Sequence, residues 1–243
     1  MRSLVVGASA GLGRALAEEL ARRGHDLYLV ASDERDLEPL ARDLTLVHGV
    51  TVHTHAADLA ALDPTDLRAG YDQRFDDLDC LFLVAGLGDP DDSGSVDPVL
   101  LDRLIAVNFA AGVRIVNVFL DDLATRPGAH IVGVGSVAAA RARRNNSVYG
   151  ASKRALEFYF EAIRHYLADA PCRVQFYRLG YMATQMFGDR ETMLPVARPE
   201  QVARAMVDRL GGASGVRYLP NWWRWVMLLI RLLPWPIFKR LDV

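Results

Sequence analysis

Short apolar runs rich in β-branched and aromatic side chains recur along the chain, and polar or glycine-containing segments separate them. Runs of this length bounded by turn residues are typical of strands. The predicted strands span residues 3–7, 26–32, 50–56, 80–86, 130–136, 173–180 and 216–220. Several are apolar at consecutive positions, which indicates strands that are buried on both faces.

Between these runs, apolar residues recur at helical spacing. Leu12, Leu16 and Leu20 form one stripe, and Gly24 supplies a stop signal after it. The second stripe consists of Leu156, Phe160, Ile163 and Leu167. Strands that alternate with helices, joined by right-handed crossovers, place helices on both faces of a parallel sheet. We therefore predict an α/β fold, a doubly wound Rossmann-type parallel sheet of about seven strands.

Composition adds to this prediction a single domain over residues 1–243, with 51% hydrophobic and 24% charged residues. Segments 88–98 and 211–215 are interpreted as surface loops. The net charge of −2 argues against nucleic acid as a partner. Cys80 and Cys172 lack metal-ligand spacing, so we predict no metal site and no disulfide. With no room for a signal peptide before the glycine-rich turn, a cytoplasmic location is expected.

A glycine-rich turn lies directly between the first predicted strand and the first predicted helix. Its members are Gly7, Ser9, Gly11, Leu12 and Gly13. Backbone amides and the helix dipole at such a turn favour a pyrophosphate group. The alternative is a tight turn that needs positive φ and binds nothing.

A tyrosine and a lysine occupy positions i and i+4 at the start of a predicted helix, as Tyr149 and Lys153, and Ser136 ends the strand before it. This spacing puts phenol and ammonium on one helix face, and we expect the nearby positive charge to lower the pKa of the phenol. Tyr149 would then protonate an alkoxide as hydride arrives, while Ser136 hydrogen-bonds the same oxygen. An ordinary helix-surface pair is the alternative.

With these motifs in this order, nearly the whole chain resembles the short-chain dehydrogenase/reductase family. The resemblance implies that Asn108 anchors a helix kink and continues a proton relay from the lysine. The implied catalytic tetrad is Asn108, Ser136, Tyr149 and Lys153. Tyr149 and Lys153 are also implied cofactor contacts. Asn108 could instead be an ordinary polar residue of a helix.

The resemblance also implies that Asp58, with Leu59 beside it, contacts the adenine of the cofactor, although Asp58 could instead cap the helix that follows. Two motifs depart from the family pattern. Asn-Asn-Ala-Gly is replaced by residues 83–86, which retain Ala85 and Gly86. Pro-Gly is replaced by Leu-Gly at residues 179–180, with Thr184 at the expected spacing. Ala85, Gly86 and Gly180 still permit close backbone approach, so we expect cofactor binding to survive.

The choice between NAD(H) and NADP(H) depends on the end of the second strand. An acidic residue there would bond a ribose hydroxyl and repel a 2′-phosphate, but the position is Ala31, followed by Ser32 and Asp33. Neither cofactor is excluded, and the pattern slightly favours NADP(H), with Ser32 as a phosphate contact.

Residues 137–147 lie between Ser136 and Tyr149 and should border the substrate. Three arginines in this segment indicate an anion, because guanidinium matches phosphate geometry, although exposed arginines often only solvate a loop. Arg143 and Arg144 are the predicted substrate contacts.

All four tryptophans lie in an apolar tail, residues 221–243. Arg224 and Arg231 share a helix face there, and Pro234 ends the helix, so a transmembrane span is not expected. Tryptophan at headgroup level and the basic pair 239–240 fit peripheral membrane contact through residues 222–240. Contact between subunits of a homo-oligomer explains the apolar tail equally well.

The arginine segment and the tail from residue 217 to residue 241 resemble those of reductases that act on decaprenylphosphoryl 2-keto-erythro-pentofuranose. The resemblance implies a polyprenyl-phosphate-linked keto sugar as substrate, a partner oxidase, and a place at the inner face of the membrane. One alternative is a soluble reductase of apolar ketones or ketoacyl groups, with the substrate along residues 181–199. Others are a non-catalytic cofactor-binding protein and a membrane-scaffolding subunit.

Overall fold

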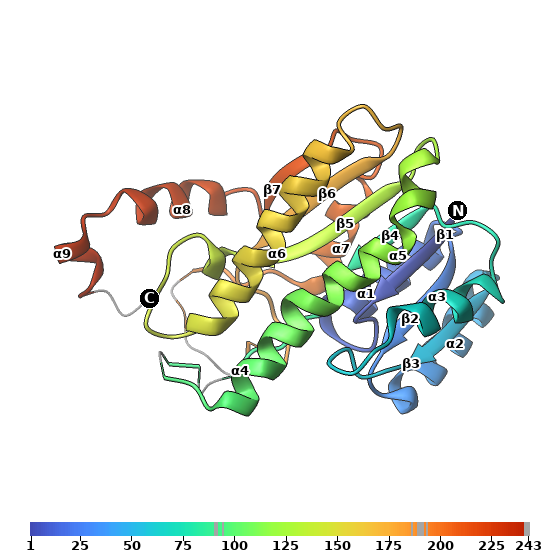
Figure 1. Cartoon of the computed structure of the whole chain (residues 1–243), viewed down its shortest axis with the longest axis horizontal. Coiled ribbons are helices and arrows are strands. Elements are labelled where there is room, and N and C mark those ends of the chain that lie inside the picture. The colour runs from blue at the N-terminus through green and yellow to red at the C-terminus, as the bar shows by residue number, and fades with distance from the viewer. Residues whose placement is uncertain (90–91, 94, 186, 189–191, 193, 241–243) are drawn as a thin grey trace.

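The seven predicted strands are all present, in one parallel sheet with the order β3-β2-β1-β4-β5-β6-β7. This computed structural model describes residues 1–240 apart from 90, 91, 94, 186, 189–191 and 193. The strands are β1 (Arg2–Val6), β2 (Asp26–Ala31), β3 (Val52–Ala56), β4 (Cys80–Leu83), β5 (His130–Ser136), β6 (Arg173–Leu179) and β7 (Gly215–Leu219). Figure 1 shows the sheet at the centre, with helices around it.

Helices fill the connections between the strands. They are α1 (Gly11–Arg22), α2 (Glu34–His48), α3 (Pro64–Asp72), α4 (Pro98–Ile105), α5 (Ala111–Thr125), α6 (Ser147–Tyr166), α7 (Pro199–Val207), α8 (Trp223–Leu232) and α9 (Trp235–Phe238). A π-helical turn, η1 (Ala106–Ala110), joins α4 to α5, and a short 3-10 helix, η2 (Val137–Ala139), follows β5.

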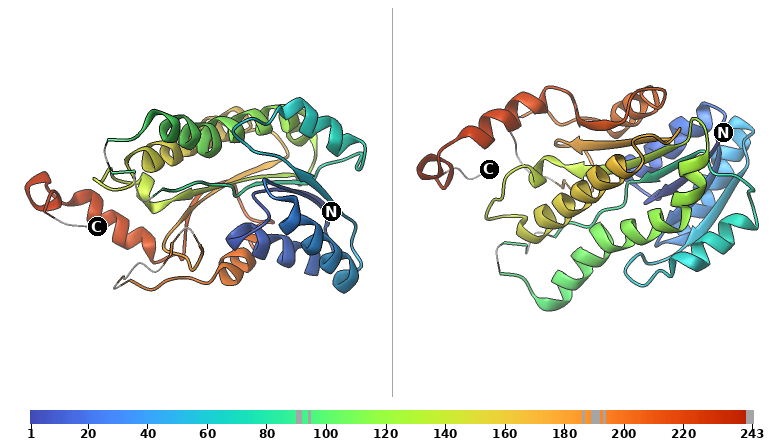
Figure 2. Two further views of the ribbon diagram at one scale, coloured as in Figure 1. Left: turned by 90° about the horizontal axis from the view of Figure 1, so that it is seen from below. Right: turned by 45° about the horizontal axis from the view of Figure 1, so that its top comes forward.

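The sheet has a separate hydrophobic core on each face. Val5 of β1 packs with α1, α2 and α7 on one face, whereas Leu4 and Val6 pack with α3, α5 and α6 on the other. Figure 2 shows these two helix layers with the sheet between them. Because successive strand residues enter opposite cores, both must be apolar, which explains the continuous apolar runs. The predicted doubly wound fold is confirmed.

The fourth strand is shorter than predicted, because β4 ends at Leu83. The amides of Val84 and Ala85 both donate to the carbonyl oxygen of Val6, so the chain leaves the regular ladder there. This turn carries Ala85 across the end of β1 to the glycine-rich turn.

The C-terminal arm, residues 221–240, contains α8 and α9 and extends away from the sheet (Figures 1 and 2). Trp223 and Met227 hold its first turns against Val137. As predicted, the long helix ends just before Pro234. The last three residues of the predicted tail lie outside the described residues. Among the helices that the structure describes, none has the length and apolar character needed to span a bilayer.

Candidate active site

A cleft of about 500 Å³ lies at the carboxyl ends of the central strands, where ligands bind in open parallel sheets. Nearly all the sequence-predicted residues line it. They are Gly7, Ser9, Gly11, Leu12, Gly13, Ser32, Asp58, Leu59, Ala85, Gly86, Ser136, Arg143, Tyr149, Lys153, Gly180 and Thr184. Asn108 and Arg144 are not lining residues.

The glycine-rich turn requires glycine for steric reasons. Gly7 has φ +93°, and a Cβ there would lie 2.7 Å from the backbone of Ala85. A Cβ on Gly13 would lie 1.8 Å from the carbonyl oxygen of Gly7. The turn therefore lies flat against the end of β4 and opens the start of α1 to the cleft, where backbone amides can meet an anion. Ala10, at the N-cap of α1, makes no side-chain cap.

Tyr149 projects from the first turn of α6 toward Ser136 at the end of β5. The Ser136 hydroxyl accepts a hydrogen bond from the amide of Ala138 at 3.1 Å and is hydrogen-bonded to the Tyr149 phenol. Burial raises the pKa of Tyr149 above its ordinary value, and the bond to Ser136 only partly opposes this shift. The predicted lowering of the phenol pKa by Lys153 is therefore wrong for this structure.

The position of the Lys153 ammonium explains why it does not lower the pKa of Tyr149. Its Nζ donates to the carbonyl oxygens of Ala85 at 3.0 Å and Val134 at 3.3 Å, at the ends of β4 and β5. Burial lowers the pKa of this lysine to about 8. Gly86 makes room for it, because a Cβ there would lie 2.9 Å from Nζ. The lysine is thus fixed by backbone carbonyls.

Asn108 lies in η1, so the predicted helix interruption is present at this residue. Its side-chain amide donates to the carbonyl oxygen of Leu87 at 2.8 Å, and its Oδ1 accepts from the Leu87 amide at 2.7 Å. The pair of bonds fixes the backbone just after Gly86. The implied proton relay through Asn108 stays a prediction.

The structural role of Asp92 was not predicted from the sequence, since segment 88–98 was interpreted as a surface loop. Asp92 is buried, and its carboxylate accepts from the amides of Val148 and Tyr149 at 2.9 and 2.7 Å and from the Ser147 hydroxyl at 2.6 Å. Burial favours a higher pKa for Asp92, but these hydrogen bonds outweigh it and lower the pKa. Asp92 therefore caps the helix that carries Tyr149.

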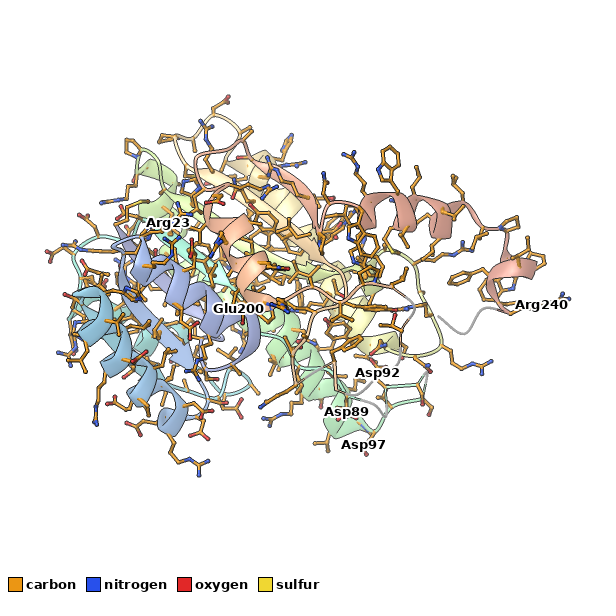
Figure 3. The ribbon with its side chains drawn as sticks, turned by 180° about the vertical axis from the view of Figure 1, so that it is seen from behind. Arg23, Asp89, Asp92, Asp97, Glu200 and Arg240 are labelled. Atoms are coloured by element: carbon orange, nitrogen blue, oxygen red, sulfur yellow. The ribbon has the colours of Figure 1, made fainter. Side chains whose placement is uncertain are left out.

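No local signal could have found this cap. Asn146 occupies the N-cap position of α6, but it has φ +63° and makes no side-chain cap. Instead its amide donates to the backbone carbonyl of Asp92. Asp97, labelled with Asp92 in Figure 3, is the N-cap residue of α4.

At the end of the cleft predicted to take the adenine, Asp58 accepts from the amide of Ala60 at 3.1 Å and lies 3.5 Å from Arg103. The alternative that Asp58 caps the next helix is wrong, because Asp63 caps α3. At the end of β2, Ser32 lines the cleft and Asp33 does not. Asp33 instead caps α2 and pairs with Arg35.

Gly180 was expected to make room for the cofactor, but the space left by its absent side chain is occupied by a tryptophan. A Cβ at this position would lie 1.7 Å from Nε1 of Trp223, so the absent side chain accommodates the indole of α8. The backbone of Gly180 still lines the cleft.

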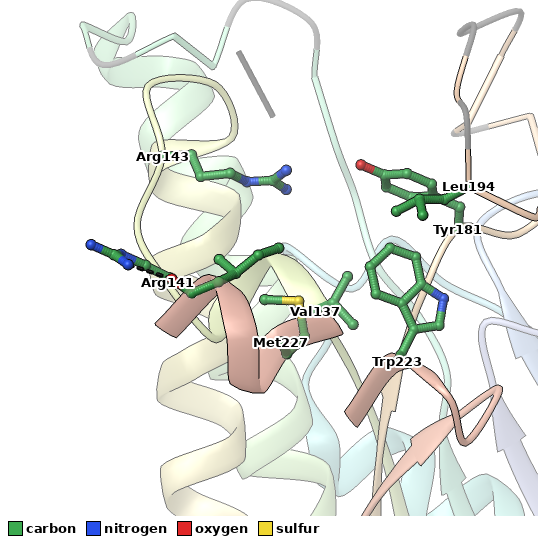
Figure 4. A pocket seen from close by; sticks show the side chains of 8 residues that line it. Val137, Arg141, Arg143, Tyr181, Leu194, Trp223 and Met227 are labelled. Atoms are coloured by element: carbon green, nitrogen blue, oxygen red, sulfur yellow. Dashed lines mark hydrogen bonds between the residues drawn. The ribbon is translucent and has the colours of Figure 1, made fainter. Parts of the chain in front are cut away.

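Of the two predicted substrate contacts, Arg143 and Arg144, only Arg143 lines the site. Arg143 lines both the cleft and a smaller adjoining cavity with Tyr181, Trp223 and Met227, whereas Arg144 is exposed and lines neither. Figure 4 shows the Arg143 guanidinium and the Tyr181 hydroxyl pointing toward each other across this cavity. Segment 181–199 contributes several cleft residues, although part of it lies outside the described residues.

Arg141 has a different role. Its guanidinium donates to the carbonyl oxygens of Ile230 and Leu233, at the end of α8, and lies 3.8 Å from the ring centroid of Phe238. These contacts join the segment before Tyr149 to the C-terminal arm.

A phosphate-cradling turn at the end of β1, with a serine, a tyrosine and a lysine converging beside it, defines a dinucleotide-dependent oxidoreductase. The sequence profile of the short chain dehydrogenase family matches residues 2–195, and the chain belongs to that family. It is an NAD(P)-dependent oxidoreductase that acts on CH–OH or C=O groups. This membership argues against the non-catalytic alternatives.

An uncharacterized oxidoreductase of Streptomyces coelicolor is 32% identical over 246 residues, covering 99% of this chain and 95% of that protein. A very-long-chain 3-oxoacyl-CoA reductase of Neurospora crassa is 28% identical over 239 residues, covering 93% of this chain and 71% of that protein. The structure of a short-chain dehydrogenase from Sphingobium yanoikuyae in complex with NADPH is 28% identical, with a TM-score of 0.79 and 96% of each chain covered.

Proposed function

We propose that Tyr149 is the general acid of a carbonyl reduction. When bound, the nicotinamide would supply hydride to the carbonyl carbon. The raised pKa of Tyr149 keeps the phenol protonated at neutral pH, so it can donate to the oxygen that becomes the alcohol. Ser136, hydrogen-bonded to the phenol, would hold the same oxygen. Lys153 would contact the cofactor, and Asn108 would position the strand end beside the lysine.

The cleft fits a dinucleotide. Gly7 and Gly13 allow backbone to approach closely where the pyrophosphate would lie, and the start of α1 faces the same space. Ser32 would contact a 2′-phosphate, and no acidic side chain at Ala31 would repel it. The Sphingobium relative, whose solved structure is a complex with NADPH, supports the preference for NADP(H).

For the substrate, we propose a polyprenyl-phosphate-linked keto sugar. The observation that carries this proposal is the position of Arg143, which lines the same cleft as Tyr149 and also the apolar cavity under α8. A cation between a polar cleft and a wall of Tyr181, Trp223 and Met227 suits a substrate with a carbonyl, an anionic group and a hydrocarbon chain. A partner oxidase would supply the keto group.

A ketoacyl thioester is a second candidate, and it shares the same three features. The similarity to a very-long-chain 3-oxoacyl-CoA reductase favours it. Oxidation of NADPH and NADH should be followed with a polyprenyl-phosphoryl 2-keto-pentose, with long-chain 3-ketoacyl thioesters and with simple ketones. We expect turnover with the lipid-linked sugar. Turnover of the thioesters alone would select the second candidate, and turnover of simple ketones alone would reject both.

The two arginines provide a matched test of anion recognition. Arg143→Ala should raise KM for the anionic substrate roughly tenfold or more, because it removes a charged hydrogen-bond donor from the cleft. Arg144→Ala removes an equal charge from the next residue, which is exposed and does not line the cleft, and should leave KM unchanged. Equal effects of the two variants on KM would contradict a specific role for Arg143.

A further inference from the structure

The C-terminal arm exposes a continuous series of large apolar side chains. Each is between 49% and 71% exposed, namely Trp225, Leu228, Leu229, Leu232, Trp235 and Ile237. Single exposed apolar residues are normal on a protein surface, but a contiguous group of this kind marks a contact surface.

The helices that bear these exposed residues are firmly packed against the rest of the protein on their other side. Trp223 and Met227 are buried on the opposite side of α8, and Arg141 holds the carbonyl oxygens at the end of the helix. Phe238 of α9 is also buried, beneath the same guanidinium. The arm, which extends away from the sheet (Figure 2), is therefore anchored on one side, while its other side stays apolar and exposed.

The charges around this surface all have one sign. Arg224, Arg231, Lys239 and Arg240 are its charged residues, and residues 221–240 contain no aspartate or glutamate. The chain as a whole carries a formal charge of −2, so the arm is a local basic region on an otherwise acidic protein. Figure 3 shows Arg240 at the far end of the arm.

We propose that the C-terminal arm is a docking surface for an anionic lipid bilayer. Trp225 and Trp235 lie on either side of the aliphatic residues of α8, and tryptophan with flanking arginine and lysine suits the headgroup region. With 10 residues, α8 is too short to cross a bilayer and would lie in its plane. The charge of the arm matches anionic headgroups. The proposal does not depend on which carbonyl substrate is used.

The test is cosedimentation of the full-length protein with vesicles of phosphatidylcholine alone, or with about one third phosphatidylglycerol, at two salt concentrations. We expect binding to the anionic vesicles that falls with salt. The triple variant Trp225→Ser, Leu229→Ser and Leu232→Ser should bind at least about tenfold more weakly, because it removes the apolar contact. Arg224→Glu with Arg231→Glu should reduce binding to anionic vesicles by a similar factor.

Matched controls come from other surfaces. Leu46 and Val47 of α2 are 84% and 65% exposed, so Leu46→Ser with Val47→Ser removes two highly exposed apolar side chains from another surface. Arg173→Glu with Arg204→Glu makes the same charge change at exposed positions of β6 and α7. Both controls should bind vesicles like the unmodified protein. Thermal unfolding and NADPH binding will verify that each variant is folded.

Three outcomes would overturn the proposal. The first is no binding of the unmodified protein to either kind of vesicle. The second is equal loss of binding in the control variants. The third is arm variants that change the oligomeric state, measured by light scattering, without changing vesicle binding, because this would make the arm a contact between copies of the chain.

Discussion

Burial shifts the pKa values of Tyr149 and Lys153 in opposite directions, because the charged form of a phenol is an anion and the charged form of an amine is a cation. Removing water disfavours the phenolate of Tyr149, so its pKa rises. It also disfavours the ammonium of Lys153, whose pKa falls to about 8. The neutral phenol is the form that a reduction needs, whereas the reverse oxidation needs the phenolate as a base.

These pKa directions predict how the two reaction directions depend on pH. Because Tyr149 keeps its proton above its ordinary pKa, kcat/KM for reduction should not fall through loss of this acid between about pH 6 and pH 9. Oxidation should become faster over the same range, by up to about tenfold per pH unit. Any weakening of cofactor binding above pH 8 would report the loss of charge on Lys153.

Steady-state rates in both directions, measured across this range, test the prediction. As a reference, Tyr149→Phe should lower kcat by about 100-fold to 10,000-fold and leave NADPH binding nearly unchanged, because only the acidic hydroxyl is lost. If the rate of reduction declined around pH 7 in the unmodified protein but not in a Lys153 variant, the titrating acid would be Lys153 and not Tyr149.

At the scale of elements, α6 receives its cap from a distant loop. Asp92 binds the first amides of α6 through a buried carboxylate, and Asp97 binds the first amides of α4 through an exposed one. The two aspartates thus offer similar caps, but only the first belongs to the helix that bears Tyr149. Helix capping and the placement of the general acid are coupled at Asp92.

This difference predicts separable effects on stability and catalysis. Asp92→Ala should lower the free energy of unfolding by about 1.5–3 kcal/mol and reduce kcat, because Tyr149 loses the bond that fixes its amide. Asp97→Ala should cost about 1 kcal/mol without changing kcat. Urea unfolding and steady-state kinetics of both variants provide the measurement. A matching fall in kcat for Asp97→Ala, or an unchanged kcat for Asp92→Ala, would contradict the positioning role.

The cap also shows where prediction from the sequence ends. The period of apolar positions predicted the strands and both stripes, because burial of a strand or helix face is written into neighbouring residues. Asp92 and Tyr149 lie 57 positions apart, so only the folded chain brings them together. The phenol pKa was predicted in the wrong direction for a similar reason. Spacing placed the lysine on the right helix face, but burial by several elements determines the shift.

At the scale of the whole molecule, the arm starts at the rim of the cleft. Gly180 follows β6, its amide donates to the carbonyl of Leu219 at the end of β7, and Trp223 packs against it. The apolar cavity lined by Arg143 lies between this junction and the cleft. If both proposals hold, a lipid-linked carbonyl compound could enter the cleft while its hydrocarbon chain remains near the bilayer.

Cofactor preference can be measured by thermal unfolding of the protein, because a ligand that binds only the folded state stabilises that state by mass action. At a concentration about 100 times its Kd, NADPH should add roughly 2.7 kcal/mol and raise Tm by about 5–10 °C for a chain of this size. At equal concentration NADH should raise Tm less, because Ser32 can contact only the phosphate of NADPH and no carboxylate at Ala31 binds the ribose of NADH.

Ser32→Asp places a negative charge where the 2′-phosphate would lie, so it should remove most of the NADPH shift and leave the NADH shift unchanged or larger. Asp33→Ala is the control at the neighbouring position, because Asp33 caps α2 and does not line the cleft. This control should lower the Tm of the free protein while leaving the difference between the two cofactors intact. If instead NADH stabilises the unmodified protein more than NADPH does, the preference assigned to Ser32 is wrong, although the dinucleotide cleft itself would still be supported.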